Sequence, residues 1–147
     1  MKISEINDVE RLLALRCEVI DEVFGHEPDT ALIDANRQYY SEALTDGSHI
    51  ACIATVDGTD VGCGAICLQR ELPSPENPSG RSAYLMNIYV REPFRRHGYG
   101  SKIVSWLIDE AKRHDCNKIY LETTDMGRDV YAGLGFVDFD NLMILKI

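Results

Sequence analysis

The sequence contains no apolar run long enough to cross a membrane, and residues 1–5 contain no apolar signal region. It also has no excess of positive charge, because 24 acidic residues outnumber 15 basic ones and leave a formal net charge of −9. A protein that binds nucleic acid needs a basic face. These absences argue against membrane and nucleic-acid partners, and the sequence predicts a cytoplasmic protein.

Closely paired cysteines are missing as well. The five cysteines form no Cys-x-x-Cys pair, their number is odd, and most of them lie inside apolar runs. A disulfide framework uses cysteines in pairs, and a zinc site needs closely spaced ligands. We therefore expect free thiols in a reducing compartment and no metal site.

The chain does contain enough apolar material for one packed domain over residues 1–147, since 45% of its residues are hydrophobic. Apolar periodicity, caps and turns predict strands at 2–6, 49–56, 60–69, 83–90, 118–123, 136–139 and 142–146, and helices at 9–23, 29–44, 100–114 and 128–134. A hairpin joins early strands and helices separate late ones. This order predicts an α/β fold with a mixed, mostly antiparallel sheet and helices on both faces.

The most informative segment lies between a strand and the helix at 100–114, and residues 95–101 read R-R-H-G-Y-G-S. Its two glycines let the backbone approach a ligand closely. The helix N-terminus that follows offers unpaired N–H groups and a partial positive charge, and the arginines add donors that suit phosphate oxygens. We call residues 95–101 the cradle and expect them to bind a pyrophosphate.

Other glycine-rich phosphate motifs fit the cradle less well. A P-loop requires G-x-x-x-x-G-K-[ST], which the stretch from Gly98 to Lys102 does not supply. The dinucleotide motif would need a third glycine where Ile103 stands. The remaining alternative is that the glycines merely form a tight turn from strand to helix.

Two segments together resemble the GCN5-related N-acetyltransferase (GNAT) superfamily. Residues 86–100 read MNIYVREPFRRHGYG, and residues 131–136 read YAGLGF. The resemblance implies an acyl-CoA N-acyltransferase fold and acetyl-CoA as co-substrate, whose pantetheine arm would bind the strand before the cradle and whose pyrophosphate would bind the cradle itself. The implied cofactor-binding residues are Ile88, Tyr89, Val90, Arg95, Arg96, His97, Gly98, Tyr99, Gly100 and Ser101.

The same resemblance implies that Tyr131 protonates the departing thiolate. Many members carry an asparagine seven residues before this tyrosine, whereas this chain has Thr124, followed by Asp125, which we expect to cap the short helix. Glu122, on the strand after the main helix, is the candidate base that deprotonates the amine. Weaker candidates for that base are His49, Asp60 and Glu71.

The sequence thus predicts an acetyl-CoA-dependent N-acetyltransferase acting on a primary amine of a small molecule or peptide. A non-catalytic acyl-CoA-binding or regulatory domain of the same fold is the alternative. A group of acidic residues near the first two helices favours a cationic amine, although such charge commonly serves solubility. This group comprises Glu18, Asp21, Glu22, Glu27, Asp29 and Asp34. Small domains of this family often pair through their last strands, which makes a homodimer an expectation.

Overall fold

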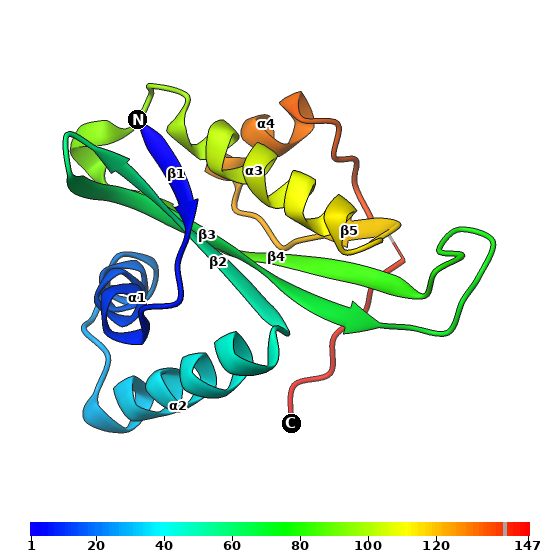
Figure 1. Ribbon diagram of the computed structural model, residues 1–147, viewed down its shortest axis with the longest axis horizontal. Helices are drawn as coiled ribbons and strands as arrows, with labels where there is room; N and C mark the ends of the chain where they lie inside the picture. The colour runs from blue at the N-terminus through cyan, green and yellow to red at the C-terminus, as the bar shows by residue number, and fades with distance from the viewer. Residues whose placement is uncertain (140) are drawn as a thin grey trace.

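The computed structural model describes residues 1–139 and 141–147, and in it five strands form one sheet in the order β1-β2-β3-β4-β5 (Figure 1). The elements are β1 (Lys2–Glu5), α1 (Val9–Phe24), α2 (Thr30–Asp46), β2 (His49–Val56), β3 (Thr59–Arg70), β4 (Arg81–Val90), the 3-10 turn η1 (Glu92–Phe94), α3 (Tyr99–Arg113), β5 (Lys118–Tyr120) and α4 (Asp125–Gly133). Strands β1 to β4 pair antiparallel, and β5 runs parallel to β4. The predicted mixed, mostly antiparallel sheet is confirmed.

Helices cover both faces of this sheet, as predicted. Figure 1 shows α1 and α2 on one side and α3 and α4 on the other. The first two helices begin where a side chain caps them, since Asp8 accepts from the Arg11 N–H and Asp29 accepts from the Leu32 N–H. Gly47, in the left-handed conformation, ends α2.

Each face has its own apolar core. On one side α3 packs Ile103, Val104 and Leu107, all fully buried, against strand residues that include Ile66. On the other side Leu12 and Leu15 of α1 lie among a second buried group on the opposite face of the strands. Burying one such side chain stabilises the fold by about 1.5–3 kcal/mol, so both helix layers are held firmly to the sheet.

The sheet opens between β4 and β5, and this opening positions the candidate site. The two strands pair over three residues only, Ser82 to Tyr84 opposite Lys118 to Tyr120. Beyond Tyr84, β4 continues to Val90 without a partner from β5. The backbone groups on this side of residues 85–90 are therefore left for another molecule.

The end of the chain differs from the prediction. The described residues of 136–139 and 142–146 form no strands, β5 ends at Tyr120 instead of residue 123, and large apolar side chains such as Met143 and Leu145 are exposed. A strand forms only where a neighbour satisfies its backbone groups, and alternating apolar residues do not by themselves provide one. The helix cap was also misassigned, because Thr124 is the N-cap of α4 and Asp125 is its first residue.

Candidate active site

The cradle forms the turn from β4 through η1 into α3. None of the backbone N–H groups from Arg96 to Ser101 donates a hydrogen bond within the described residues, and the first α3 bond joins the Lys102 N–H to the Gly98 carbonyl, 3.2 Å away. Six consecutive donors at the positive end of a helix are suited to an anion with several oxygens. The described geometry fits a pyrophosphate.

The two cradle glycines differ in backbone conformation. Gly98 has φ +74, a left-handed conformation that favours glycine. Gly100 lies in the first turn of α3 without such a φ, and a Cβ added there would meet no atom within 4 Å. The fold itself therefore gives no reason for glycine at position 100, whereas a ligand lying against the backbone would.

Arg95 and Arg91 tie this region to α1. The Arg95 guanidinium donates to Glu22, 2.5 Å away, and to the Val90 carbonyl, and Arg91 pairs with Glu18 at 2.5 Å. The contacts with Glu22 and Glu18 each join residues 73 positions apart in the sequence. Arg95, predicted to contact phosphate, is held in a link between α1 and the cradle.

The other cradle side chains are arranged around its backbone. The His97 ring donates from Nδ1 to the Arg95 carbonyl at 2.7 Å and lies 5.7 Å from the Tyr99 ring. Arg96 has φ +68, and no ion pair joins it to the described residues. Arg96 therefore keeps its charge available to a phosphate.

Ile88, Tyr89 and Val90 lie on the part of β4 that β5 leaves unpaired. Just before them, Asn87 has φ +55 at the point where the register between β3 and β4 shifts. This irregularity is a bulge, which redirects the side chains around it. Asn87 was not singled out from the sequence, although asparagine is among the residues that tolerate such a conformation.

Tyr131 and Glu122 line one open groove of about 1260 Å³ between β5, α4 and the segment that follows, and Tyr84 lines it too. Burial raises the pKa of Tyr131. Burial also raises the pKa of Tyr84, and the nearby Glu122 carboxylate adds to that effect. The structure therefore brings the predicted acid and the predicted base to the same groove.

The weaker base candidates lie elsewhere. His49 is buried beneath α2 with its Nδ1 3.1 Å from the Tyr39 hydroxyl, and burial lowers its pKa to about 4. Asp60 is paired with Arg11, and the hydrogen bond from Arg11 lowers its pKa. Glu71 accepts hydrogen bonds from several neighbours, Lys118 among them. None of the three lines the groove of Tyr131.

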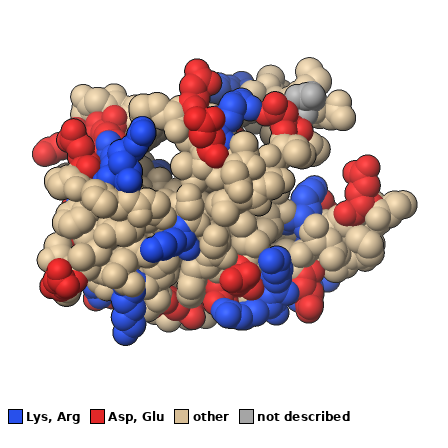
Figure 2. All heavy atoms as spheres, turned by 90° about the horizontal axis from the view of Figure 1, so that it is seen from above, with Lys and Arg blue, Asp and Glu red and all other residues tan. Residues whose placement is uncertain are grey.

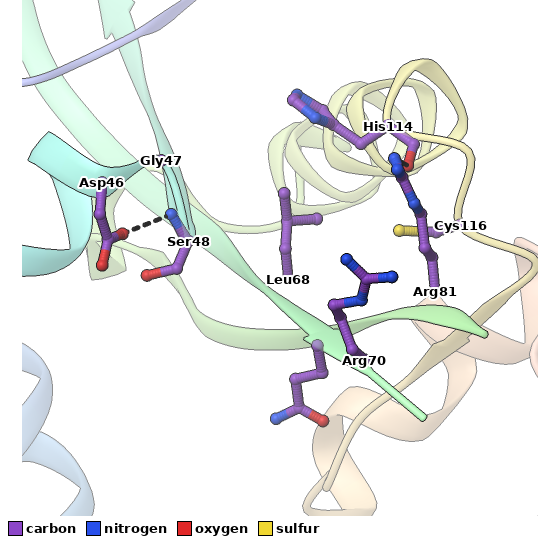
Figure 3. A pocket seen from close by; sticks show the side chains of 9 residues that line it. Asp46, Gly47, Ser48, Leu68, Arg70, Arg81, His114 and Cys116 are labelled. Carbon is purple, nitrogen blue, oxygen red and sulfur yellow. Dashed lines mark hydrogen bonds between the residues drawn. The ribbon is translucent and has the colours of Figure 1, made fainter. Parts of the chain in front are cut away.

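A second, smaller cavity of about 380 Å³ lies at the far end of α3 and contains no predicted site residue. Figure 3 shows Arg70 projecting into it between Leu68 and Arg81, with His114 and Cys116 beyond. On the face in Figure 2, acidic and basic side chains are interspersed over a largely uncharged surface. The groove of Tyr131 is the larger of the two cavities and the one with candidate catalytic groups.

Gly127 is a further site residue that the sequence did not reveal. A Cβ there would lie 2.6 Å from the Thr123 Oγ1 and 3.2 Å from the Tyr131 ring, so the glycine lets this ring lie close to its own helix, α4. Its four-residue spacing from Tyr131 on one helix was the available signal.

Comparison with known proteins agrees with this geometry. The model of the acetyltransferase (GNAT) family matches residues 9–136. The chain belongs to this family. Among solved structures, this GNAT chain is similar to a protein from Clostridium acetobutylicum described as a predicted acetyltransferase with acetyl-CoA, with a TM-score of 0.86, 27% identity, and coverage of 99% of this chain and 94% of that one.

Two curated relatives are more distant or match over a shorter region. Thialysine N-epsilon-acetyltransferase from Bos taurus is 36% identical over 62 residues, which cover 40% of this GNAT chain and only 36% of the cattle protein. Aminoglycoside N(6')-acetyltransferase type 1 from Serratia marcescens is 24% identical over 115 residues, covering 76% of this chain and 78% of that protein.

Two further features of this GNAT chain concern membranes and metals. No helix among the described residues has the length and apolar character needed to span a bilayer. Across residues 1–139 and 141–147, no three His, Cys, Asp or Glu side chains are grouped so that they could hold a metal ion.

Proposed function

We propose that this protein is an acetyl-CoA-dependent N-acetyltransferase that transfers the acetyl group directly to a primary amine of a small molecule or peptide. The observation that carries the proposal is the run of free N–H groups from Arg96 to Ser101, with a glycine at position 100 that the fold does not require. Membership of the GNAT family supports the same donor.

Two parts of the chain would hold acetyl-CoA. The cradle N–H groups and Arg96 would bind its pyrophosphate, and the unpaired edge of β4 at Ile88, Tyr89 and Val90 would hydrogen-bond its pantetheine arm. Once bound, acetyl-CoA supplies an activated acyl group as a thioester. Arg95 contributes indirectly, because its bonds to Glu22 and Val90 fix the strand and the cradle against α1.

Tyr131 would hold the proton that the leaving thiolate needs. A tyrosine titrates near pH 10 and a thiol near 8.5, so the transfer is uphill by about 2 kcal/mol for these reference values. Burial disfavours both the phenolate and the thiolate, so it raises the pKa of the Tyr131 hydroxyl and that of the CoA thiol. The difference of about 2 kcal/mol between them remains, and a hydrogen bond can offset it. Tyr131 therefore remains protonated at neutral pH and can donate.

Glu122 would accept a proton from the incoming amine. An alkyl amine with a pKa of about 10.4 is neutral in only about one molecule in 2,500 at pH 7, an unfavourable pre-equilibrium of about 4.6 kcal/mol. A carboxylate in the same groove as Tyr131 can take the proton directly or through water. The backbone N–H of Val90 would stabilise the oxyanion that forms during attack.

The proposal also concerns where the enzyme works. All five cysteines are free, and Cys52 and Cys63 are buried as thiols. Free thiols of this kind suit a reducing compartment such as the cytoplasm.

Thermal unfolding with and without acetyl-CoA tests the proposal, with NAD and ATP as controls. A ligand at 100 times its Kd adds about 2.7 kcal/mol, which should raise Tm by roughly 5–10 °C. The variant Gly100→Asp should fold normally, because position 100 is open, yet lose the shift, because a carboxylate would repel the pyrophosphate. A wild-type protein that acetyl-CoA does not stabilise would contradict the proposal.

Release of CoA thiol in the presence of an amine separates an enzyme from a domain that only binds acyl-CoA. The thermal shift and the thiol assay together therefore test both steps of the proposed function.

A further inference from the structure

Arg16 stands apart from the other arginines around α1. It is half-buried, and its guanidinium donates from Nη1 to the Asn87 side-chain oxygen at 3.0 Å and from Nε to that of Asn36 at 3.3 Å. Both partners are neutral amides. A guanidinium carries five N–H donors, so three of them have no acceptor among the described residues.

The neighbouring arginines are all matched by carboxylates. Arg11 pairs with Asp60, Arg91 with Glu18 and Arg95 with Glu22, while Arg37 pairs with Glu10 and Asp34. No described carboxylate forms such a pair with Arg16. The free N–H groups of Arg16 are not sealed off from solvent, so an anion from outside can reach them.

Two titratable groups on which the charge of Arg16 acts do not supply that anion. Burial raises the pKa of the Cys63 thiol to about 12, and burial likewise raises the pKa of the Tyr40 hydroxyl. Both groups are therefore neutral at physiological pH, although the charge of Arg16 acts on each of them. Within the described residues, the guanidinium of Arg16 is therefore hydrogen-bonded only to neutral amides.

Through Asn87, Arg16 also lies beside the part of β4 that is proposed to hold acetyl-CoA. Asn87, its partner, immediately precedes Ile88, Tyr89 and Val90, the β4 residues proposed to hold acetyl-CoA. Arg16 and Asn36 approach β4 from α1 and α2, whereas the cradle leads into α3 on the opposite face of the sheet (Figure 1). An acceptor that approached from the α1 and α2 side would reach Arg16 and the acyl group together.

From this arrangement we propose that Arg16 binds a carboxylate of the acceptor, so that the substrates are amines that also carry a carboxylate, such as amino acids. The inference rests on the proposed function and names its acceptor class. The guanidinium has two or more parallel donors to offer, the geometry that a carboxylate accepts best.

The acidic residues that favoured a cationic acceptor are largely engaged within the protein. Glu18, Glu22 and Asp34 form ion pairs with arginines, and Asp29 caps α2. The charge of these four residues is therefore partly balanced by arginines or by a helix end, and only Asp21 and Glu27 of the group have neither kind of partner among the described residues. The positive charge of a polyamine would also meet that of Arg16.

The test compares amines in pairs that differ only in this one group: glycine with glycinamide, β-alanine with β-alaninamide, and L-lysine with L-lysinamide. Thiol release from acetyl-CoA gives kcat/KM for each. We expect the best carboxylate substrate to exceed its amide partner by about 10- to 100-fold, the usual worth of a charge-assisted hydrogen bond. The amides lose a proton from their amines more easily, so reactivity alone would give the opposite order.

Variants of Arg16 then assign the preference to this side chain. Arg16→Gln should abolish the preference by lowering kcat/KM for the carboxylate-bearing substrates alone. Arg16→Lys should restore part of the preference, because lysine keeps the positive charge but lacks the parallel N–H donors of a guanidinium. Arg37→Gln, which removes a charge between the same two helices, should leave the preference intact. Acetyl-CoA binding, measured by thermal shift, should be unchanged in all three variants.

The outcomes distinguish a failure of the carboxylate inference from a failure of the proposed acetyltransferase function. Equal rates for paired substrates, equal losses for both members in Arg16→Gln, or no turnover of any carboxylate-bearing amine by protein that binds acetyl-CoA would overturn the inference alone. Failure of the wild-type protein to bind acetyl-CoA would overturn the proposed function itself.

Discussion

Tyr131 combines two properties that a proton donor needs at neutral pH. Its ring is fixed, because it packs edge-on against Phe136 at 5.8 Å between centroids and lies close above Gly127. Its pKa is raised by burial, so the hydroxyl keeps its proton at neutral pH. A hydrogen bond to the departing thiolate would offset the small difference between the two pKa values and allow the proton to transfer.

Tyr131→Phe should therefore lower kcat by about 100-fold or more, the usual contribution of a general acid, with little change in the KM for acetyl-CoA. Steady-state kinetics of thiol release measure both constants. Tyr39→Phe removes a hydroxyl that hydrogen-bonds His49 outside the groove and should leave kcat near the wild-type value. An unchanged kcat in Tyr131→Phe would remove this residue from the mechanism.

Among the secondary-structure elements, α3 is the one whose start would carry the proposed function. Its N-cap, Gly98, needs a left-handed backbone, whereas Gly100 in its first turn does not. A glycine that the backbone does not need costs helix stability relative to alanine. Gly100 therefore weakens the start of α3 slightly and leaves the backbone there uncovered by a side chain.

Alanine substitutions at these two positions should have opposite effects on folding. Gly98→Ala should lower the free energy of unfolding by about 1 kcal/mol or more, because alanine is strained at φ +74. Gly100→Ala should raise it by about 0.5 kcal/mol while weakening acetyl-CoA binding at least tenfold. Urea unfolding and calorimetric titration measure the two quantities. If Gly100→Ala binds acetyl-CoA as well as wild type, the backbone at position 100 does not touch the ligand.

The sequence predicted those elements whose causes are local. Periodic apolar residues, capping residues and the cradle glycines lie within a few positions of one another, so α1, α2 and α3 could be located closely. The bond from Arg95 to Glu22 spans 73 positions and could not be foreseen, so the sequence suggested only a phosphate as the partner of Arg95. The segments 136–139 and 142–146 have strand-like sequences, but their pairing depends on neighbours that no local pattern specifies.

At the scale of the whole molecule, α2 is held to the sheet by a buried imidazole. His49 lies within 6 Å of the rings of Tyr39 and Tyr40 and pairs across the strands with Cys67. Burial lowers its pKa from 6.5 to about 4, and its Nε2 has no hydrogen-bond partner among the described residues. The two rings packed against it are phenols, and no carboxylate is hydrogen-bonded to it among the described residues.

Global stability should consequently fall as the pH is lowered through this range. The unfolded chain takes up a proton near pH 6.5 and the folded chain only near pH 4, so the contribution of His49 is complete above pH 6.5 and is lost progressively toward pH 4. Between pH 7 and pH 5 the expected loss is about 2 kcal/mol.

Denaturant unfolding at pH 7 and pH 5 measures this loss. His49→Gln should flatten the dependence, and the exposed His26→Gln should not. Identical pH dependence in wild type and His49→Gln would show that carboxylates alone account for acid sensitivity.

Because β4 diverges from β5, residues 85–90 of β4 form an unpaired strand edge between two strands of the same sheet. Soluble proteins protect exposed edges because unpaired backbone groups recruit other chains and promote aggregation. Here the edge of residues 85–90 is retained because the proposed donor has amide groups that can lie along it as an extra strand would. The substrate then completes the sheet, and the empty protein should be the form that precipitates first during purification and storage.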